Sequence, residues 1–204
     1  MFKSEIRILG FDDGAFEFED KWKNKKRPTA RKKTVPVVGV IFRGGHFLDG
    51  ALRTDVTIDG VDSTDKLAEL INNTRHKRQI RVIMFDGITL GGFNIIDIRR
   101  LNEETGLPVI VVNRKMPDLE RVRKALRNFR NYKKRWSLIE RAGKIKQCKL
   151  KGGKNVYYQS FGLSDEETEE IIALSSTHGQ IPEPLRAAHI IATAVVKGES
   201  GGRA

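Results

Sequence analysis

The sequence predicts an α/β fold built around a mixed β-sheet. Residues 80 to 87, IRVIMFDG, are apolar at both odd and even positions up to Asp86. A strand that is apolar on both faces belongs in the middle of a sheet covered on both sides. Three apolar runs with short connections precede this strand, and apolar runs alternate with amphipathic helices after it. The residues expected on the two faces are Ile80, Val82 and Met84 on one, and Ile83 and Phe85 on the other.

The N-terminal part of the chain reads as an antiparallel meander. Strands are expected at residues 5–11, 35–42 and 46–58, with a tight turn at Gly44-Gly45 and a bulge at Gly50. The first apolar run, IRILGFDDG, ends in Asp12 and Asp13 just as the central strand ends in Asp86.

The rest of the chain alternates helices and strands. Pro108 to Asn113 (PVIVVN) is a second buried strand, and the helix expected before it implies a parallel, right-handed connection from the central strand. Ser164 and Glu167 have the spacing of a capping box. Helices are expected at 62–71, 94–105, 117–129, 131–142, 164–175 and from 182 onward, with a hairpin formed by 144–150 and 156–161.

The element order is therefore βββαβαβα followed by a C-terminal extension, which is the order of an RNase H-like sheet. In such a sheet the first and fourth strands are neighbours, so Asp12 should lie near Asp86. We expect one domain over residues 1–198, with a mobile basic arm at 20–34 and a frayed tail at 199–204.

The net charge of +12 is concentrated in two blocks. Residues 20–34 carry eight Lys or Arg against one Asp, and residues 114–154 carry sixteen against three acidic residues, so the remainder of the chain is net negative. A basic surface beside an acidic centre suits a polyanion held over a metal-binding pocket. Solvated lysine faces on a thermostable protein are the alternative explanation.

The cysteine count and the hydropathy of the chain exclude several kinds of protein. Cys148 is the only cysteine, which excludes an intramolecular disulfide and a cysteine-based zinc cluster. The chain has no secretory signal and no long apolar run, so we expect a cytoplasmic protein that makes no membrane contact. The oligomeric state is left open.

Asp12 and Asp86 are expected at the carboxyl ends of two central strands, which is where active sites lie in open α/β sheets. Such groups repel one another unless a divalent cation neutralises them, and their hard oxygens favour Mg²⁺ or Mn²⁺. We expect Asp12 and Asp86 to be metal ligands, with Asp55 as the best third ligand. Asp59 and Asp62 compete with Asp55, although turn or cap chemistry also explains both.

His189 is a further candidate, on the last helix. It shares an apolar stripe with Leu185, Ala188, Ala192 and Val196, and on spacing alone a core histidine is the simpler interpretation.

Several stretches resemble endonuclease V. IRVIMFDG followed by a Gly-rich loop and GLPVIVV is similar to its Asp-Gly strand, helix and Leu-Pro strand, and IPEPLRAAHIIAT is similar to its last helix. GFDDG and DGITLGGFNIIDI, residues 86–98, more closely resemble a related family of formerly uncharacterised proteins, sometimes called endonuclease dU. The resemblance covers nearly the whole chain. No counterpart of the Pro-Tyr-x-Pro-Gly wedge of endonuclease V stands between Gly44 and Asp62.

The resemblance implies that Asp12 and Asp86 bind metal. It places Asp55 near the position of a glutamate ligand of endonuclease V, and it implies a catalytic role for His189, which matches the His/Asp position of the last helix. We therefore expect a Mg²⁺- or Mn²⁺-dependent endonuclease, acting on nucleic acid, DNA in preference to RNA, and beside a deaminated base. The alternatives are a non-catalytic nucleic-acid-binding protein and a small-phosphoester hydrolase. The cations expected to contact nucleic acid are Lys25, Lys26, Arg27, Arg31, Lys32, Lys33, Arg121 and Lys124.

Overall fold

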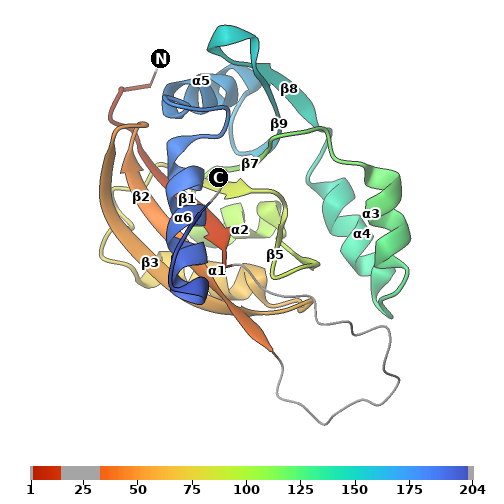
Figure 1. The fold of residues 1–204 in the computed structure, drawn as a ribbon. Coiled ribbons are helices and arrows are strands. Elements are labelled where there is room, and N and C mark those ends of the chain that lie inside the picture. Colours follow the sequence, from red (N-terminus) through yellow and green to blue (C-terminus); the bar gives the residue numbers. More distant parts are fainter. Residues whose placement is uncertain (1, 15–32, 202–204) are drawn as a thin grey trace.

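A seven-stranded mixed sheet forms the centre of the computed structural model, which describes residues 2–14 and 33–201 (Figure 1). The strands lie in the order β3-β2-β1-β4-β7-β9-β8. Their bounds are β1 Arg7–Asp13, β2 Thr34–Arg43, β3 Phe47–Thr57, β4 Val82–Asp86, β7 Val109–Asn113, β8 Lys146–Lys149 and β9 Asn155–Phe161. A separate small hairpin joins β5, Thr89–Leu90, to β6, Asn94–Ile95.

The pairing confirms the predicted mixed sheet. β1, β2 and β3 form an antiparallel meander, whereas β1, β4 and β7 run parallel, with Phe11 opposite Phe85. The β2–β3 register shifts beside Gly50, because Ile41 pairs with Gly50 and Phe42 with Leu48. The hairpin formed by β8 and β9 continues the sheet, since β9 pairs antiparallel with β7.

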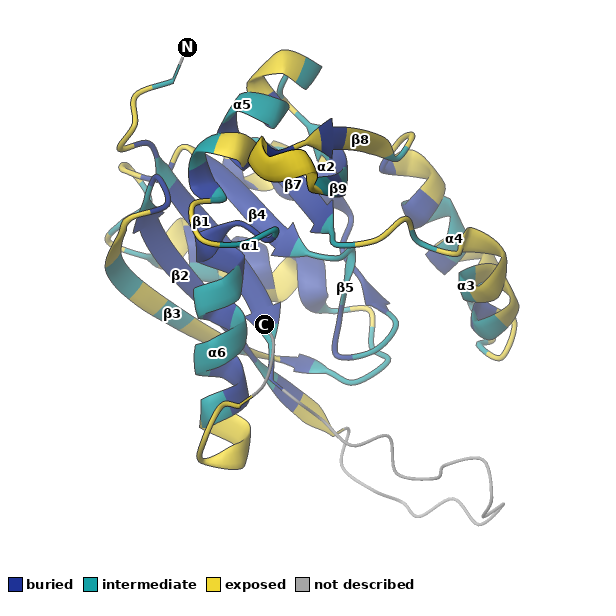
Figure 2. Ribbon diagram, turned by 45° about the horizontal axis from the view of Figure 1, so that its top comes forward, coloured by how far each residue is buried: buried dark blue, intermediate teal, exposed yellow. Residues whose placement is uncertain are grey.

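Helices cover both faces of the sheet, and a helical pair lies to one side (Figures 1 and 2). Their bounds are α1 Ser63–Asn73, α2 Ile98–Thr105, α3 Leu119–Leu126, α4 Tyr132–Arg141, α5 Asp165–Ser175 and α6 Glu183–Lys197, with a 3-10 turn at Lys151–Gly153. α1 and α2 pack on one face and α5 and α6 on the other. α3 and α4 pack together and against Ile95 of β6. Among the described residues, no helix is both long enough and apolar enough to cross a bilayer.

The alternation of side chains along the strands divides the core in two. Phe11 and Phe85 stack under α1 and α2, with ring centroids 5.4 Å apart, whereas Met84 packs toward α5 and α6. The prediction that Ile80 shares a face with Met84 is wrong, because Ile80 precedes the strand and packs with the α1 cluster. A central strand covered on both faces is confirmed.

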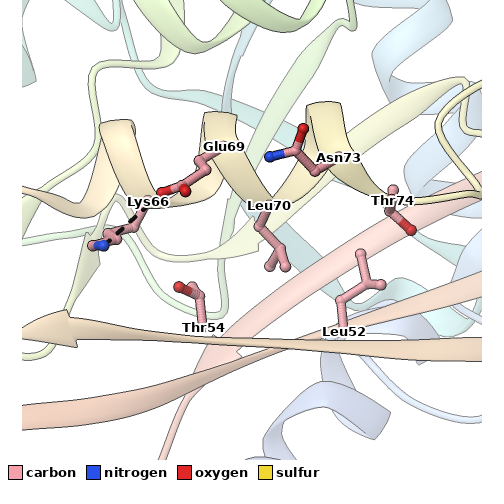
Figure 3. Close-up of a pocket in the computed structure, with 7 residues that line it drawn as sticks. All are labelled: Leu52, Thr54, Lys66, Glu69, Leu70, Asn73 and Thr74. Carbon is pink, nitrogen blue, oxygen red and sulfur yellow. Dashed lines mark ion pairs between the residues drawn. The ribbon is translucent and has the colours of Figure 1, made fainter.

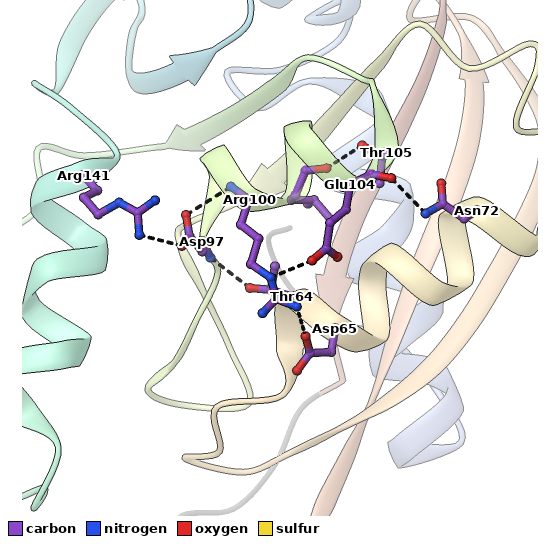
Figure 4. Close-up of polar contacts among 9 residues, drawn as sticks. Thr64, Asp65, Asn72, Asp97, Arg100, Glu104, Thr105 and Arg141 are labelled. Atoms are coloured by element: carbon purple, nitrogen blue, oxygen red, sulfur yellow. Dashed lines mark hydrogen bonds and ion pairs between the residues drawn. The ribbon is translucent and has the colours of Figure 1, made fainter.

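The start of α2 differs from the predicted helix at 94–105. Asn94 belongs to β6, and the helix begins at Ile98 after Asp97 caps it by accepting a hydrogen bond from the Arg100 backbone N–H, at 3.3 Å. Asp97 also pairs with Arg141 of α4 at 3.0 Å (Figure 4). Arg100 pairs with Asp65 of α1 and with Glu104, so ion pairs join three helices on this face.

Candidate active site

Asp12 and Asp86 lie at the carboxyl ends of neighbouring parallel strands. Phe11 and Phe85 are paired residues of β1 and β4, and the two aspartates follow them directly. The pleat turns both carboxylates to the face covered by α6. Asp12 is 7% exposed, and Asp86 is partly buried. Gly87 has a φ of +79°, which lets the chain turn away immediately after Asp86. The predicted convergence of these two carboxylates therefore follows from the sheet order.

Helix α6 brings His189 to Asp12. The helix packs closely on β1 at Gly10, where a Cβ atom would come within 2.6 Å of the Pro184 Cβ atom. One and a half turns later the His189 Nδ1 atom lies 2.7 Å from the Asp12 Oδ2 atom. The His189 side chain is 43% exposed, so it is not a core histidine. Its hydrogen bond to Asp12 raises the pKa of the imidazole and outweighs the opposing effect of burial.

The electrostatics of Asp86 reflect a crowded acidic centre. Burial and then the charge of Asp12 raise the pKa of Asp86 from 3.8 to about 6, although the cations of Arg114 and His189 oppose this shift. Arg114 directly follows β7, the neighbour of β4, so its charge lies beside the end of β4. Sequence reasoning counted Arg114 in a basic block without assigning it to the site. Its position just after a strand parallel to β4 was the available signal.

Asp13 faces away from Asp12, as predicted for a regular strand. Its carboxylate accepts a hydrogen bond from the Gly91 backbone N–H on the α1 side of the sheet. Burial raises the pKa of Asp13 to about 6, and the charges of Asp12 and Asp86 add to this effect. Asp13 is thus a third acidic group that interacts electrostatically with Asp12 and Asp86, although its side chain lies on the opposite face of the sheet.

Asp55 is not brought to this pair. It lies on edge strand β3, two strands away from β1, and its side chain pairs with Arg53 at 3.1 Å. Because Asp55 pairs in register with Pro36 whereas Asp12 pairs with Val38, it is also displaced along the sheet. We therefore leave Asp55 out of the candidate site.

Asp59 and Asp62, the alternatives to Asp55, accept hydrogen bonds from neighbouring groups of the chain. Asp62 accepts hydrogen bonds from Thr57 and from the Asn94 side chain, and these bonds lower its pKa despite the opposing effect of burial. Asp59, which has a φ of +54°, accepts a hydrogen bond from the Phe93 backbone N–H at 3.0 Å. Both contacts agree with turn chemistry.

The residues predicted to contact nucleic acid fall in two places. Lys25, Lys26, Arg27, Arg31 and Lys32 lie outside the described residues. Lys33 is exposed just before β2, and Arg121 and Lys124 are exposed on α3. Arg123, Arg127 and Arg130 are exposed with them, so the side pair formed by α3 and α4 presents a basic surface.

Four cavities lined by described residues lie away from Asp12, Asp86 and His189. One of about 400 Å³ opens between β3 and α1, lined by Leu52, Leu70 and polar side chains (Figure 3). Its lining contains neither Asp12, Asp86 nor His189. This cavity is therefore separate from the candidate site.

The carboxylates of Asp12 and Asp86 fit a cation that keeps part of its own hydration shell. Among the described residues, no group of three His, Cys, Asp or Glu side chains is arranged to hold a metal ion. Two converging carboxylates remain, and Mg²⁺ is commonly held by one or two carboxylates with waters and substrate phosphates filling the other positions. Asp12 and Asp86 are thus a suitable pair.

Solved structures share this fold. A protein of unknown function from Archaeoglobus fulgidus matches with a TM-score of 0.79 and 38% identity, over 94% of this chain and 99% of that one. Endonuclease V from Bacillus subtilis matches with a TM-score of 0.58 and 11% identity, over 96% and 82% of the two chains. Argonaute from Marinitoga piezophila matches at 0.50 with 14% identity, over 93% of this chain and 30% of that one. The predicted RNase H-like fold is confirmed.

Sequence comparisons identify the family. A UPF0215 protein from Methanothermobacter thermautotrophicus is 50% identical over 99% of this chain and 93% of its own length. A UPF0215 protein from Pyrococcus furiosus is 45% identical over 97% of this chain and 96% of its own length. The family model described as endonuclease dU matches residues 4–196. The chain therefore belongs to the endonuclease dU family.

Proposed function

We propose that this protein is a divalent-metal-dependent endonuclease that hydrolyses a phosphodiester bond in nucleic acid. The observation that carries the proposal is the convergence of Asp12 and Asp86 on the face where His189 is hydrogen-bonded to Asp12. The family and the endonuclease V-like fold support a nuclease in general. The metal requirement, the substrate and a role in DNA repair are parts of the proposal.

Each site residue has a distinct task. Asp12 and Asp86 would hold the cation, which when bound would activate water and stabilise the leaving oxygen. His189 is bonded through Nδ1, and Nε2 has no partner among the described residues, so Nε2 is available to give a proton to a substrate oxygen. Arg114 supplies positive charge beside Asp86, where a phosphate group would lie.

DNA containing a deaminated base is the substrate that we favour. The description of the matching family names dU, and deoxyuridine is the product of cytosine deamination in DNA. One structural neighbour, endonuclease V from Ciona intestinalis, is in complex with a DNA that contains inosine. The exposed cations on and next to α3 suit a strand held by its phosphates.

The test is cleavage of end-labelled oligonucleotides that contain uracil, inosine or an abasic site, with Mg²⁺ or Mn²⁺ and with a chelator. We expect metal-dependent cleavage, strongest beside uracil, and none for Asp86→Asn. Asp55→Asn is the matched control, because it removes a carboxylate outside the pair, and it should cleave like the wild type. Binding without cleavage by the wild-type protein under all metal conditions would contradict the proposal and favour a non-catalytic binding protein.

A further inference from the structure

The connection that follows Asp86 is held by hydrogen bonds from two sides. Residues 87–93 leave β4 and form most of the small hairpin before α2. Gly87, Gly91 and Gly92 have positive φ values, so the path depends on glycine at three points. We call residues 87–93 the glycine loop. Its geometry determines what backbone surface lies next to Asp86.

Asp13 fastens this loop from the β1 side. Its Oδ2 atom accepts the hydrogen bond from the Gly91 N–H, while the Gly91 carbonyl accepts one from the Asp59 N–H at 2.7 Å. Both polar groups of the Gly91 backbone are therefore used. A Cβ atom at Gly91 would come within 2.9 Å of the Val35 Cγ1 atom, and φ is +56° there. The loop has little freedom to shift at this residue.

A second attachment holds the loop from the side of α4. The Arg135 guanidinium, 4% exposed, donates to the carbonyls of Asp59, Gly60 and Phe93. Asp59 in turn accepts from the Phe93 N–H. The loop is thus attached to α4 behind it, and Asp13 is the contact that ties it to the strand carrying Asp12.

Asp13 also touches Asp12 through the backbone. Its N–H donates to the Asp12 Oδ1 atom at 2.8 Å, while the Asp12 Oδ2 atom is bonded to His189. One residue therefore fixes the rotamer of Asp12 on one face and the glycine loop on the other.

We propose that Asp13 is a positioning residue, which holds the glycine loop in register with Asp12 and Asp86 through its bond to Gly91. The effect on cleavage rests on the proposed function, whereas the attachment of the loop does not. Asp13 acts as a hydrogen-bond acceptor here, so an uncharged acceptor of the same shape should replace it.

The kinetic test compares Asp13→Asn, which keeps an oxygen acceptor, with Asp13→Ala, which does not. We expect Asp13→Ala to lose about 10- to 100-fold in kcat, the scale of a small misplacement of reacting groups. Its Mn²⁺ affinity should match the wild type, and Asp13→Asn should recover most of the rate. Equal loss of rate and of metal affinity in both variants would overturn the proposal, because Asp13 would then act through its charge.

The structural test needs no substrate. Hydrogen exchange at the Gly91 amide should be slow in the wild type and in Asp13→Asn, and fast in Asp13→Ala, with unchanged exchange in β4. If the wild type cleaved none of the oligonucleotides, the proposed function would fail while this result still supported the attachment. Unchanged protection of Gly91 in Asp13→Ala would overturn the positioning role even if cleavage were lost.

Discussion

Asp86 lowers the stability of the folded protein at neutral pH. Its pKa is raised from 3.8 to about 6 by burial and by Asp12, so the folded state holds the proton more tightly than the unfolded chain. The penalty is absent below the unfolded pKa of 3.8, grows as the pH rises from there to about 6, and is full above that value. Asp86→Asn should therefore raise the free energy of unfolding near pH 7.5 by about 2 kcal/mol, and hardly at all below about pH 4. Urea denaturation at both pH values checks this, and equal gains at both would contradict it.

The same carboxyl group must lose its proton before it can bind a cation. We expect Mn²⁺ affinity to fall as the pH is lowered through about 6, with protons released on binding. Isothermal titration calorimetry in buffers of different ionisation enthalpy measures both quantities. Asp86→Asn should abolish binding, whereas Asp55→Asn should bind like the wild type. Retained affinity in Asp86→Asn would remove Asp86 from the metal site.

His189 should be needed for turnover and nearly dispensable for folding. Its side chain is 43% exposed, and exposed ion pairs contribute at most about 1 kcal/mol to stability. Because the folded pKa is raised, this small contribution is full below about pH 6.5 and is lost as the pH rises through the raised value. His189→Ala should thus keep its melting temperature near pH 8 and lose cleavage. A variant with full activity and a clearly lower melting temperature would restore the core interpretation.

Residues at strand ends were predictable from the sequence, and residues that depend on register were not. Asp12 and Asp86 each end an apolar run, and the element order makes their strands neighbours. Asp55 lies on a predicted strand too, but its distance from Asp12 depends on sheet order and register together. The hydrogen bond from Gly91 to Asp13 joins the glycine loop to the last residue of β1, and no periodicity signals such a contact.

At the scale of the element, α4 should depend on one buried cation. Arg135 donates to three backbone carbonyls and to the Asn131 side chain, and it stacks on the Phe129 ring at 4.6 Å. Arg135→Ala should cost about 2–4 kcal/mol, because partly buried carbonyls lose a charged donor from a buried side chain. Arg135→Lys should recover only part of this, since an ammonium lacks the planar fork. Lys134→Ala, an exposed neighbour on the same helix, is the control for urea denaturation and should change little.

Helices and strands with strong periodicity were predicted well, and their junctions less so. The capping box of Ser164 and Glu167 starts α5 as expected. The helix predicted from residue 94 begins four residues later, because Asn94 is drawn into the hairpin by its bonds to Thr57 and Asp62. Thr57 and Asp62 are more than 30 residues away in the sequence, so the local pattern around Asn94 does not predict these hydrogen bonds.

At the scale of the whole molecule, the order of elements predicted the topology of the first five main-sheet strands. A meander followed by a β–α–β unit leaves few arrangements that keep short, right-handed connections. The position of β8 and β9 was not predictable in the same way. A hairpin can join either edge of a sheet, and here β9 pairs with β7 because its apolar side, with Val156 and Tyr158, completes the core under α5.

The two basic blocks give the last prediction, which concerns binding of nucleic acid by the whole protein. Each phosphate contact should add about 0.7–0.9 to the slope of log affinity against log salt. One variant changes six cations of the first block to Gln, namely Lys25, Lys26, Arg27, Arg31, Lys32 and Lys33. A second variant makes the same change to Gln at Arg121, Arg123, Lys124, Arg127 and Arg130. We expect the first to flatten the slope, because its cations follow the strand that carries Asp12 and precede β2 in the sequence.

Fluorescence anisotropy with a labelled oligonucleotide over a range of salt concentrations measures both slopes. Metal affinity should stay at the wild-type value in each variant, and preference among uracil-, inosine- and abasic-containing strands should hardly change, since phosphate contacts position a strand without reading its bases. If the first variant keeps the wild-type slope and the second loses it, the exposed cations of α3 and its flanking turn hold the substrate. Because α4 packs with α3 and attaches to the glycine loop through Arg135, that outcome would place the phosphate-binding surface and the acidic edge on one connected support.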